Sequence, residues 1–144
     1  MQRRWRSAAG TIALIVALCA ACGDTVDVLL DCASPDGQYI ATFFMVRGSG
    51  VPGFLYTRLT LRRTRDSLTP DSYILQLAGG YDVRLAWLDA RRLLVEFPDD
   101  ARTDVAETQA WAGERFEVTY APIPGKKGLL IPSGSVCLPT SRVE

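Results

Sequence analysis

The chain has 144 residues, with 16 basic and 16 acidic side chains and no histidine. Its balanced charge argues against a nucleic-acid role that depends on a basic field. The lack of histidine excludes Ser-His-Asp and Cys-His triads, imidazole proton transfer and histidine metal ligands.

The first 22 residues have the pattern of an export signal that ends at a lipid-modified cysteine. Arg3, Arg4 and Arg6 form a positively charged start, and an apolar run follows over residues 8–21. The run is shorter than the ~20 residues that a spanning helix needs, so a secretory signal is favoured over a transmembrane helix. Small residues precede Cys22, and this stretch resembles the lipobox of bacterial lipoproteins. The resemblance implies that the Cys22 thiol carries diacylglycerol and that Cys22 becomes the new N-terminus.

Cleavage before Cys22 divides the chain into a signal peptide (1–21), a lipid-anchored tether (22–25) and a single β domain (26–140). We therefore expect an exported protein that its lipid holds to a bacterial membrane. In a cell with two membranes this would be the outer membrane, on its periplasmic side. The alternative is an ordinary cleaved signal peptide with Cys22 as a spare thiol. Residues 22–144 hold 13 basic and 16 acidic residues, a net charge of −3.

Two cysteines, Cys32 and Cys137, remain in the exported part once Cys22 carries lipid. In an oxidising compartment such a pair favours a disulfide. The closed loop would be long, so the expected stabilisation is large, roughly 4–5 kcal/mol. The alternative is a pair of inert buried thiols.

The first half of the domain predicts strands separated by turns. Alternation over residues 26–32 places Val26, Val28, Leu30 and Cys32 on one inner face. Residues 34–37 (Ser-Pro-Asp-Gly) suit a type I turn. Residues 39–46 are apolar on both faces, which is typical of a central strand.

The second half continues the same pattern. A longer strand is expected over residues 54–64, and shorter ones at 73–77, 83–87, 93–97, 116–120, 129–131 and 136–138. Residues 105–112 fit either a short helix or an irregular crossover. No long segment shows helical periodicity. The sequence thus predicts a mainly β fold, a small single-domain antiparallel β-sheet or β-sandwich behind the cleaved signal peptide.

An internal echo aligns residues 34–42 with residues 87–95. Both segments resemble the turn-and-strand unit of Tol-type or WD40-like propeller blades. A propeller needs at least four blades of four strands, and this chain has room for about two. Together with the Cys22 anchor and the strand spacing over residues 31–121, the echo resembles a loose group of small bacterial lipoproteins of unknown function. That group implies no catalytic residues.

Few side chains suggest a binding surface. Tyr56, Arg58 and Arg62 share one face of the strand at 54–64, with Arg63 and Arg65 at its end. They form either an anion or lipid-headgroup patch or a solvated outer face. Trp111 is the candidate for an exposed aromatic contact, whereas Trp87 is in phase with core residues.

Two further clusters favour simple turns over ligand sites. Asp99, Asp100, Asp104 and Glu107 lack the spacing of an EF-hand loop. Residues 125–128 (Gly-Lys-Lys-Gly) lack the spacing and flanking elements of a phosphate loop. We expect no metal and no cofactor.

Two function classes are compatible with these patterns. One is a non-catalytic binding or interaction module in the cell envelope, with the membrane as a partner through Cys22, another envelope protein as a candidate partner and no nucleic acid. The other is an envelope hydrolase that works through Asp and Glu carboxylates, as glycosidases do. The missing histidine and the lack of any concentrated motif favour the binding module, and therefore a protein that is not an enzyme.

Overall fold

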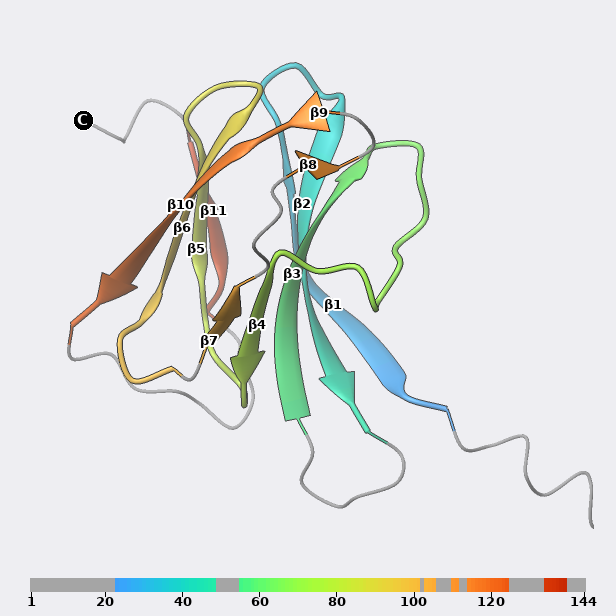
Figure 1. Cartoon of the computed structure of the whole chain (residues 1–144), viewed down its shortest axis with the longest axis vertical. Helices are drawn as coiled ribbons and strands as arrows, with labels where there is room; N and C mark the ends of the chain where they lie inside the picture. The colour runs from blue at the N-terminus through green and yellow to red at the C-terminus, as the bar shows by residue number, and fades with distance from the viewer. Residues whose placement is uncertain are drawn as a thin grey trace, which may run out of the picture.

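A computed structural model of the chain describes residues 23–48, 55–101, 103–105, 110–111, 114–124 and 134–139, and these residues form strands and turns (Figure 1). The strands are β1 (Thr25–Ala33), β2 (Tyr39–Arg47), β3 (Leu55–Arg63), β4 (Leu75–Ala78), β5 (Arg84–Trp87), β6 (Arg92–Pro98), β7 (Thr103–Val105), β8 (Ala110–Trp111), β9 (Glu114–Arg115), β10 (Glu117–Ile123) and β11 (Val136–Leu138). The predicted mainly β fold is confirmed.

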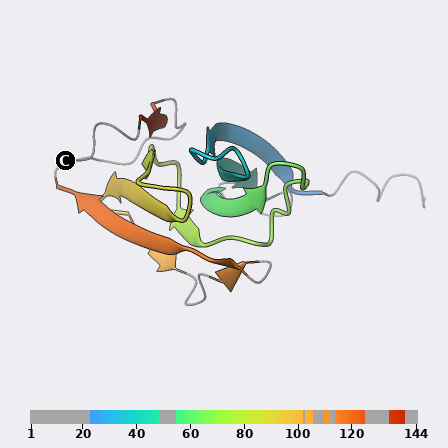
Figure 2. The same cartoon turned by 90° about the horizontal axis from the view of Figure 1, so that it is seen from above.

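The strands form two main sheets and one small pair. The first sheet has the order β1-β2-β3-β4-β7 and is antiparallel throughout. The second has the order β10-β6-β5-β11, and β8 pairs with β9 separately. Seen from above, β10 and β1 lie on opposite sides of the molecule (Figure 2). Because the inner faces of both sheets contribute to one core, the arrangement is a β-sandwich.

The second sheet is mixed, which refines the expectation of antiparallel pairing. β5 and β6 are antiparallel, but β10 runs parallel to β6 and β11 runs parallel to β5. Parallel neighbours need long crossover connections, and the chain supplies them between the paired strands. The alternation of residues along a strand shows which face is buried, but not the direction of the neighbouring strand.

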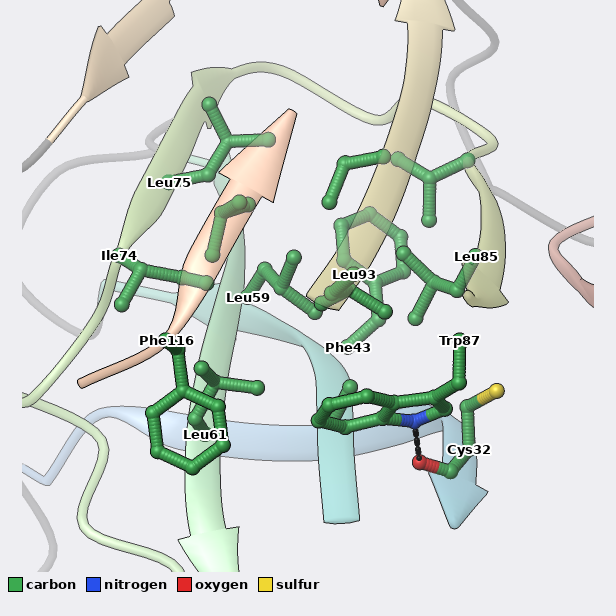
Figure 3. Close-up of a cluster of buried hydrophobic side chains, with 14 of the residues drawn as sticks. Cys32, Phe43, Leu59, Leu61, Ile74, Leu75, Leu85, Trp87, Leu93 and Phe116 are labelled. Atoms are coloured by element: carbon green, nitrogen blue, oxygen red, sulfur yellow. Dashed lines mark hydrogen bonds between the residues drawn. The ribbon is translucent and has the colours of Figure 1, made fainter. Parts of the chain in front are cut away.

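Side chains from both sheets meet in the core (Figure 3). Phe43 and Leu59 come from the first sheet, Leu85 and Leu93 from the second, and all four are fully buried. Trp87 is 2% exposed, as its phase predicted, and its indole N–H donates a 2.8 Å hydrogen bond to the carbonyl oxygen of Cys32. This bond joins β5 of one sheet to β1 of the other.

The predicted inner face of residues 26–32 is wrong in its first half, because β1 contains a bulge. The pairing shifts between Val28, which faces Phe44, and Leu30, which faces Phe43, so that Leu29 is the extra residue. A bulge reverses the alternation on one side of it. Leu30 and Cys32 therefore lie on the inner face, whereas Val28 lies on the outer face and is 54% exposed.

The predicted central strand and its turn are confirmed. In β2, Phe43 and Phe44 point to opposite faces, yet both are fully buried. The preceding turn is closed by a 2.8 Å hydrogen bond from the Gly37 N–H to the Ser34 carbonyl oxygen, and Gly37 has φ +68°. Glycine suits that left-handed conformation because it has no Cβ.

A disulfide joins Cys32 to Cys137, as predicted, with a Cα–Cα distance of 5.6 Å. It links β1, an edge strand of the first sheet, to β11, an edge strand of the second. The segment before β11 is also held by Asp82. Its carboxylate accepts a 2.8 Å hydrogen bond from the Gly134 N–H.

Residues 105–112, which the sequence left open, contribute to two short strands in the part that the structure describes, Val105 to β7 and Ala110–Trp111 to β8. The predicted strand at 129–131 and the Gly-Lys-Lys-Gly segment lie outside the described residues, as does Cys22. Within the described ranges, no helix is long and apolar enough to cross a membrane.

Candidate functional site

Arg58 and Arg62 project from the outer face of β3, as the sequence predicted, but their side chains are only 17% exposed. The guanidinium of Arg58 donates to Gln76 Oε1 at 2.7 Å and to the Pro70 carbonyl oxygen at 2.9 Å. It also lies 4.7 Å from the ring centre of Tyr73. The segment that follows β3 thus folds back over the arginine that a bare strand would expose.

Arg62 has a similar set of contacts. Its Nε donates to the Thr42 hydroxyl at 3.0 Å, one Nη donates to the Asp66 carbonyl oxygen at 2.9 Å, and the other lies 3.4 Å from the Asp31 carboxylate. The same carboxylate accepts a 2.6 Å hydrogen bond from Thr42. Arg62 therefore connects three strands of the sheet, and little of its side chain is left to the solvent.

The predicted binding surface also includes two aromatic residues, Tyr56 and Trp111. Tyr56 is half-buried on the outer face of β3. Trp111 belongs to β8, and its side chain lies outside what the structure describes. As a ligand-binding surface, Tyr56, Arg58, Arg62 and Trp111 stay a prediction.

A hollow of about 460 Å³ opens where β2 begins and β3 ends. Its lining residues are Gln38, Tyr39, Arg63, Thr64 and Arg65. They meet because Tyr39 faces Arg63 in the antiparallel pair, which brings the two strand ends together. The Thr64 N–H donates to the Gln38 carbonyl oxygen at 2.9 Å, and the Thr64 hydroxyl donates to the Gly37 carbonyl oxygen at 2.6 Å. These bonds give the hollow a fixed rim.

Arg65 also lines a second hollow, of about 500 Å³, on the side of β3 where the chain turns back. That hollow is lined by Thr60, Leu61, Arg62, Arg65, Asp66, Ser67, Thr69 and Ser72. The exposed Arg65 thus stands between the two depressions. The first hollow differs in that, among the residues that the structure describes, its lining contains two arginines and no carboxylate.

The turn beside the first hollow is stabilised by Asp36. Its carboxylate accepts hydrogen bonds from the Ser34 hydroxyl at 2.6 Å and from the Gln38 N–H at 3.1 Å. These bonds, with a smaller contribution from the charge of Arg91, hold the pKa of Asp36 below its usual value. The Arg91 guanidinium lies 3.8 Å from this carboxylate and 4.4 Å from the ring centre of Tyr39.

The second member of the internal echo uses its acidic residue in the same way. Asp89 Oδ1 accepts hydrogen bonds of 2.8 Å from the backbone N–H groups of Arg91 and Arg92, and Arg92 Nε donates to Oδ2 at 2.6 Å. The backbone bond from Arg91 and the side-chain bond from Arg92 lower the pKa of Asp89. The echo therefore corresponds to two turns that each need a carboxylate acceptor.

Among the residues that the structure describes, no three His, Cys, Asp or Glu side chains gather as ligands of a metal ion would. The chain matches no protein-family model, no curated protein and no solved structure. A function for this chain is therefore inferred from the geometry of the site. What the first hollow offers chemically is guanidinium hydrogen-bond donors with positive charge, an arrangement that suits an anionic group.

Sequence reasoning noted Arg63 and Arg65 only as the end of an arginine-rich strand and did not connect them with Gln38 and Tyr39. The connection depends on the register of β2 against β3, which places Tyr39 opposite Arg63. The available signal was the run Arg62-Arg63-Thr64-Arg65, where an exposed loop begins directly after a strand.

Proposed function

We propose that this chain is a lipid-anchored binding module of the bacterial cell envelope, which holds a ligand or an envelope partner without transforming it. The observation that supports binding best is the hollow between the ends of β2 and β3, with Arg63 and Arg65 in its lining. Support for the anchor comes from the sequence before Cys22, and the Cys32–Cys137 disulfide suits an exported protein.

The alternative, a hydrolase that uses carboxylates, is less well supported by the acidic residues of the two turns. General acid catalysis near neutral pH needs a carboxyl group whose pKa is raised. The pKa values of Asp36 and Asp89 are instead lowered by the hydrogen bonds that the two carboxylates accept. These carboxylates stabilise turns, and a binding role agrees better with that use.

The anchor is tested with Cys22→Ser placed behind a conventional cleavable signal peptide, so that no uncleaved leader holds the protein in the membrane. We expect the wild-type protein to take up a fatty-acid analogue and to sediment with membranes, and Cys22→Ser to do neither. A wild-type protein that carries no label would refute the anchor.

The released Cys22→Ser protein then serves to separate binding from catalysis. It is incubated with envelope glycans, peptides and lipid esters, and we expect no turnover of any of them. Reproducible turnover that disappears in a single Asp→Asn or Glu→Gln variant would establish the hydrolase instead.

A further inference from the structure

The arginine-lined hollow lies at the far end of β1 from the proposed lipid anchor. Two residues, Gly23 and Asp24, lie between Cys22 and Thr25, the first residue of β1, and the three residue-to-residue steps from Cys22 to Thr25 span at most about 11 Å. β1 then runs for nine residues, and its ends are roughly 25 Å apart. In Figure 1 β1 begins at the lower right, and the turn that follows it lies at the top of the molecule. That turn leads directly into Gln38 and Tyr39 of the hollow.

Different arginines lie at the two ends of the first sheet. At the anchor end, Arg47 faces Thr25 across the β1–β2 pair and forms a 3.1 Å ion pair with Asp27. At the other end, Arg63 and Arg65 line the hollow. The short tether brings the start of β1 to the membrane surface. We therefore expect Arg47, rather than Arg63 or Arg65, to contact the headgroups of the anchoring bilayer.

The hollow also stands out against the charge of the whole exported part. Residues 22–144 carry a net charge of −3, yet the described residues that line the hollow contribute two guanidinium groups and no carboxylate. The carboxylate of the neighbouring Asp36 accepts hydrogen bonds from Ser34 and Gln38 and lies 3.8 Å from the Arg91 guanidinium, whose charge opposes its own. Guanidinium groups match carboxylate and phosphate oxygens in geometry as well as in charge.

We propose that the hollow formed by Gln38, Tyr39, Arg63, Thr64 and Arg65 binds a carboxylate or phosphate group of a molecule outside the anchoring bilayer. This inference rests on the proposed function, because it takes the direction of the membrane from the lipid on Cys22. The ligand is thus an anionic group on a soluble or wall-borne molecule that approaches from the side opposite to the anchor.

The first experiment measures binding of two probes, inorganic phosphate and a fluorescent polyglutamate peptide, to the lipid-anchored protein in phosphatidylcholine vesicles at low salt. Arg65→Gln should weaken peptide binding roughly tenfold, because hydrogen bonds to charged groups are lost. Arg47→Gln removes the same charge at the other end of the sheet and should change peptide binding by less than about twofold. Equal effects of the two variants, or a wild type that binds neither probe, would overturn the proposal.

The second experiment tests the source of the anionic group with vesicles that contain phosphatidylglycerol. The Cys22→Ser protein, which has no lipid of its own, is mixed with these vesicles. We expect Arg65→Gln to leave any vesicle binding unchanged. Vesicle binding that requires Arg65 and that the peptide displaces would assign the hollow to lipid headgroups and overturn the proposed direction.

The two sets of results keep the proposals separate. If the fatty-acid analogue does not label Cys22, the anchor fails, although an Arg65-dependent affinity for the peptide still identifies an anion site. If the label is present and Arg65→Gln has no effect on peptide binding, the anchor stands and the anion site is refuted.

Discussion

Two aromatic side chains each use a polar tip to connect the two sheets of the sandwich. Trp87 on β5 donates to the Cys32 carbonyl oxygen at 2.8 Å, and the Tyr120 hydroxyl on β10 donates to the Ile74 carbonyl oxygen at 3.0 Å. In both cases the ring fills space between the sheets while the donor satisfies a backbone acceptor. These bonds fix how the sheets sit against each other, which hydrophobic packing alone leaves less specific.

Tyr120 makes stability depend on alkaline pH. Burial raises the pKa of Tyr120 from 10.0 to about 12. The folded protein therefore keeps the phenol proton at a pH where the unfolded chain has lost it, so this contribution to stability is complete below pH 10 and disappears as the pH rises toward 12. We expect Tyr120→Phe to have a smaller fall in the free energy of unfolding over this interval than the wild type.

The measurement is denaturant unfolding at a series of alkaline pH values, followed by far-UV circular dichroism. Trp87→Phe is the matched control, because it also loses a hydrogen bond between the sheets but no titrating group. Its deficit relative to the wild type should not vary with pH. A Tyr120→Phe curve parallel to that of the wild type between pH 10 and 12 would contradict the assignment.

At the level of elements, the bulge in β1 determines which apolar residues support the core. We expect Val28→Ala to lower the free energy of unfolding by less than about 0.5 kcal/mol, because Val28 is on the outer face. Leu30→Ala should cost more, about 1–2 kcal/mol, since Leu30 packs against the core. Unfolding by denaturant measures both losses. Equal losses would mean that Val28 and Leu30 share one face of β1, as the sequence suggests, and would contradict the bulge.

The strands themselves were predictable because each buries at least one face, and burial leaves a period of two residues in the sequence. The bulge at Leu29 was not, because Val26, Val28, Leu30 and Cys32 have the same spacing whether or not a residue is inserted in the pairing. The parallel directions of β10 and β11 also depend on the partner strand, about which local sequence carries no information.

The candidate site was predictable in part. The common face of Arg58 and Arg62 follows from alternation along β3, and both do lie on it. The hydrogen bonds to the Pro70 and Asp66 carbonyl oxygens could not be foreseen, because they depend on the path of the segment after β3. The hollow beside Arg63 could not be foreseen either, because it depends on the pairing of β2 with β3. That pairing places Tyr39 opposite Arg63, although the two residues are far apart in the sequence.

For the whole molecule, the Cys32–Cys137 disulfide is the strongest single constraint on the unfolded chain. The two cysteines are 105 residues apart, so the loop that the bond closes includes most of the domain. We expect the Cys32→Ala/Cys137→Ala double variant to lose about 4–5 kcal/mol of unfolding free energy, mainly through the entropy of the unfolded state. Denaturant unfolding of the oxidised protein, the reduced protein and the variant measures this loss.

In that comparison the reduced wild type should match the double variant, because both lack the bond. If oxidation raises the unfolding free energy of the wild type by less than about 1 kcal/mol, the constraint is weaker than chain entropy predicts. Such a result would mean that the reduced chain already keeps its ends together.

The order of strands in the two sheets also suggests the order in which they form during folding. β1, β2, β3 and β4 are neighbours in sequence and in space, so the first sheet can form from short hairpins as the chain emerges. One edge strand of the second sheet, β11, pairs with β5 through Val136 and Arg84, and it is the last strand in the part of the chain that the structure describes. Closing such a distant contact is slow, so we expect Cys32 to remain a thiol until β11 arrives. We therefore expect folding to end with the bond that ties β1 to β11.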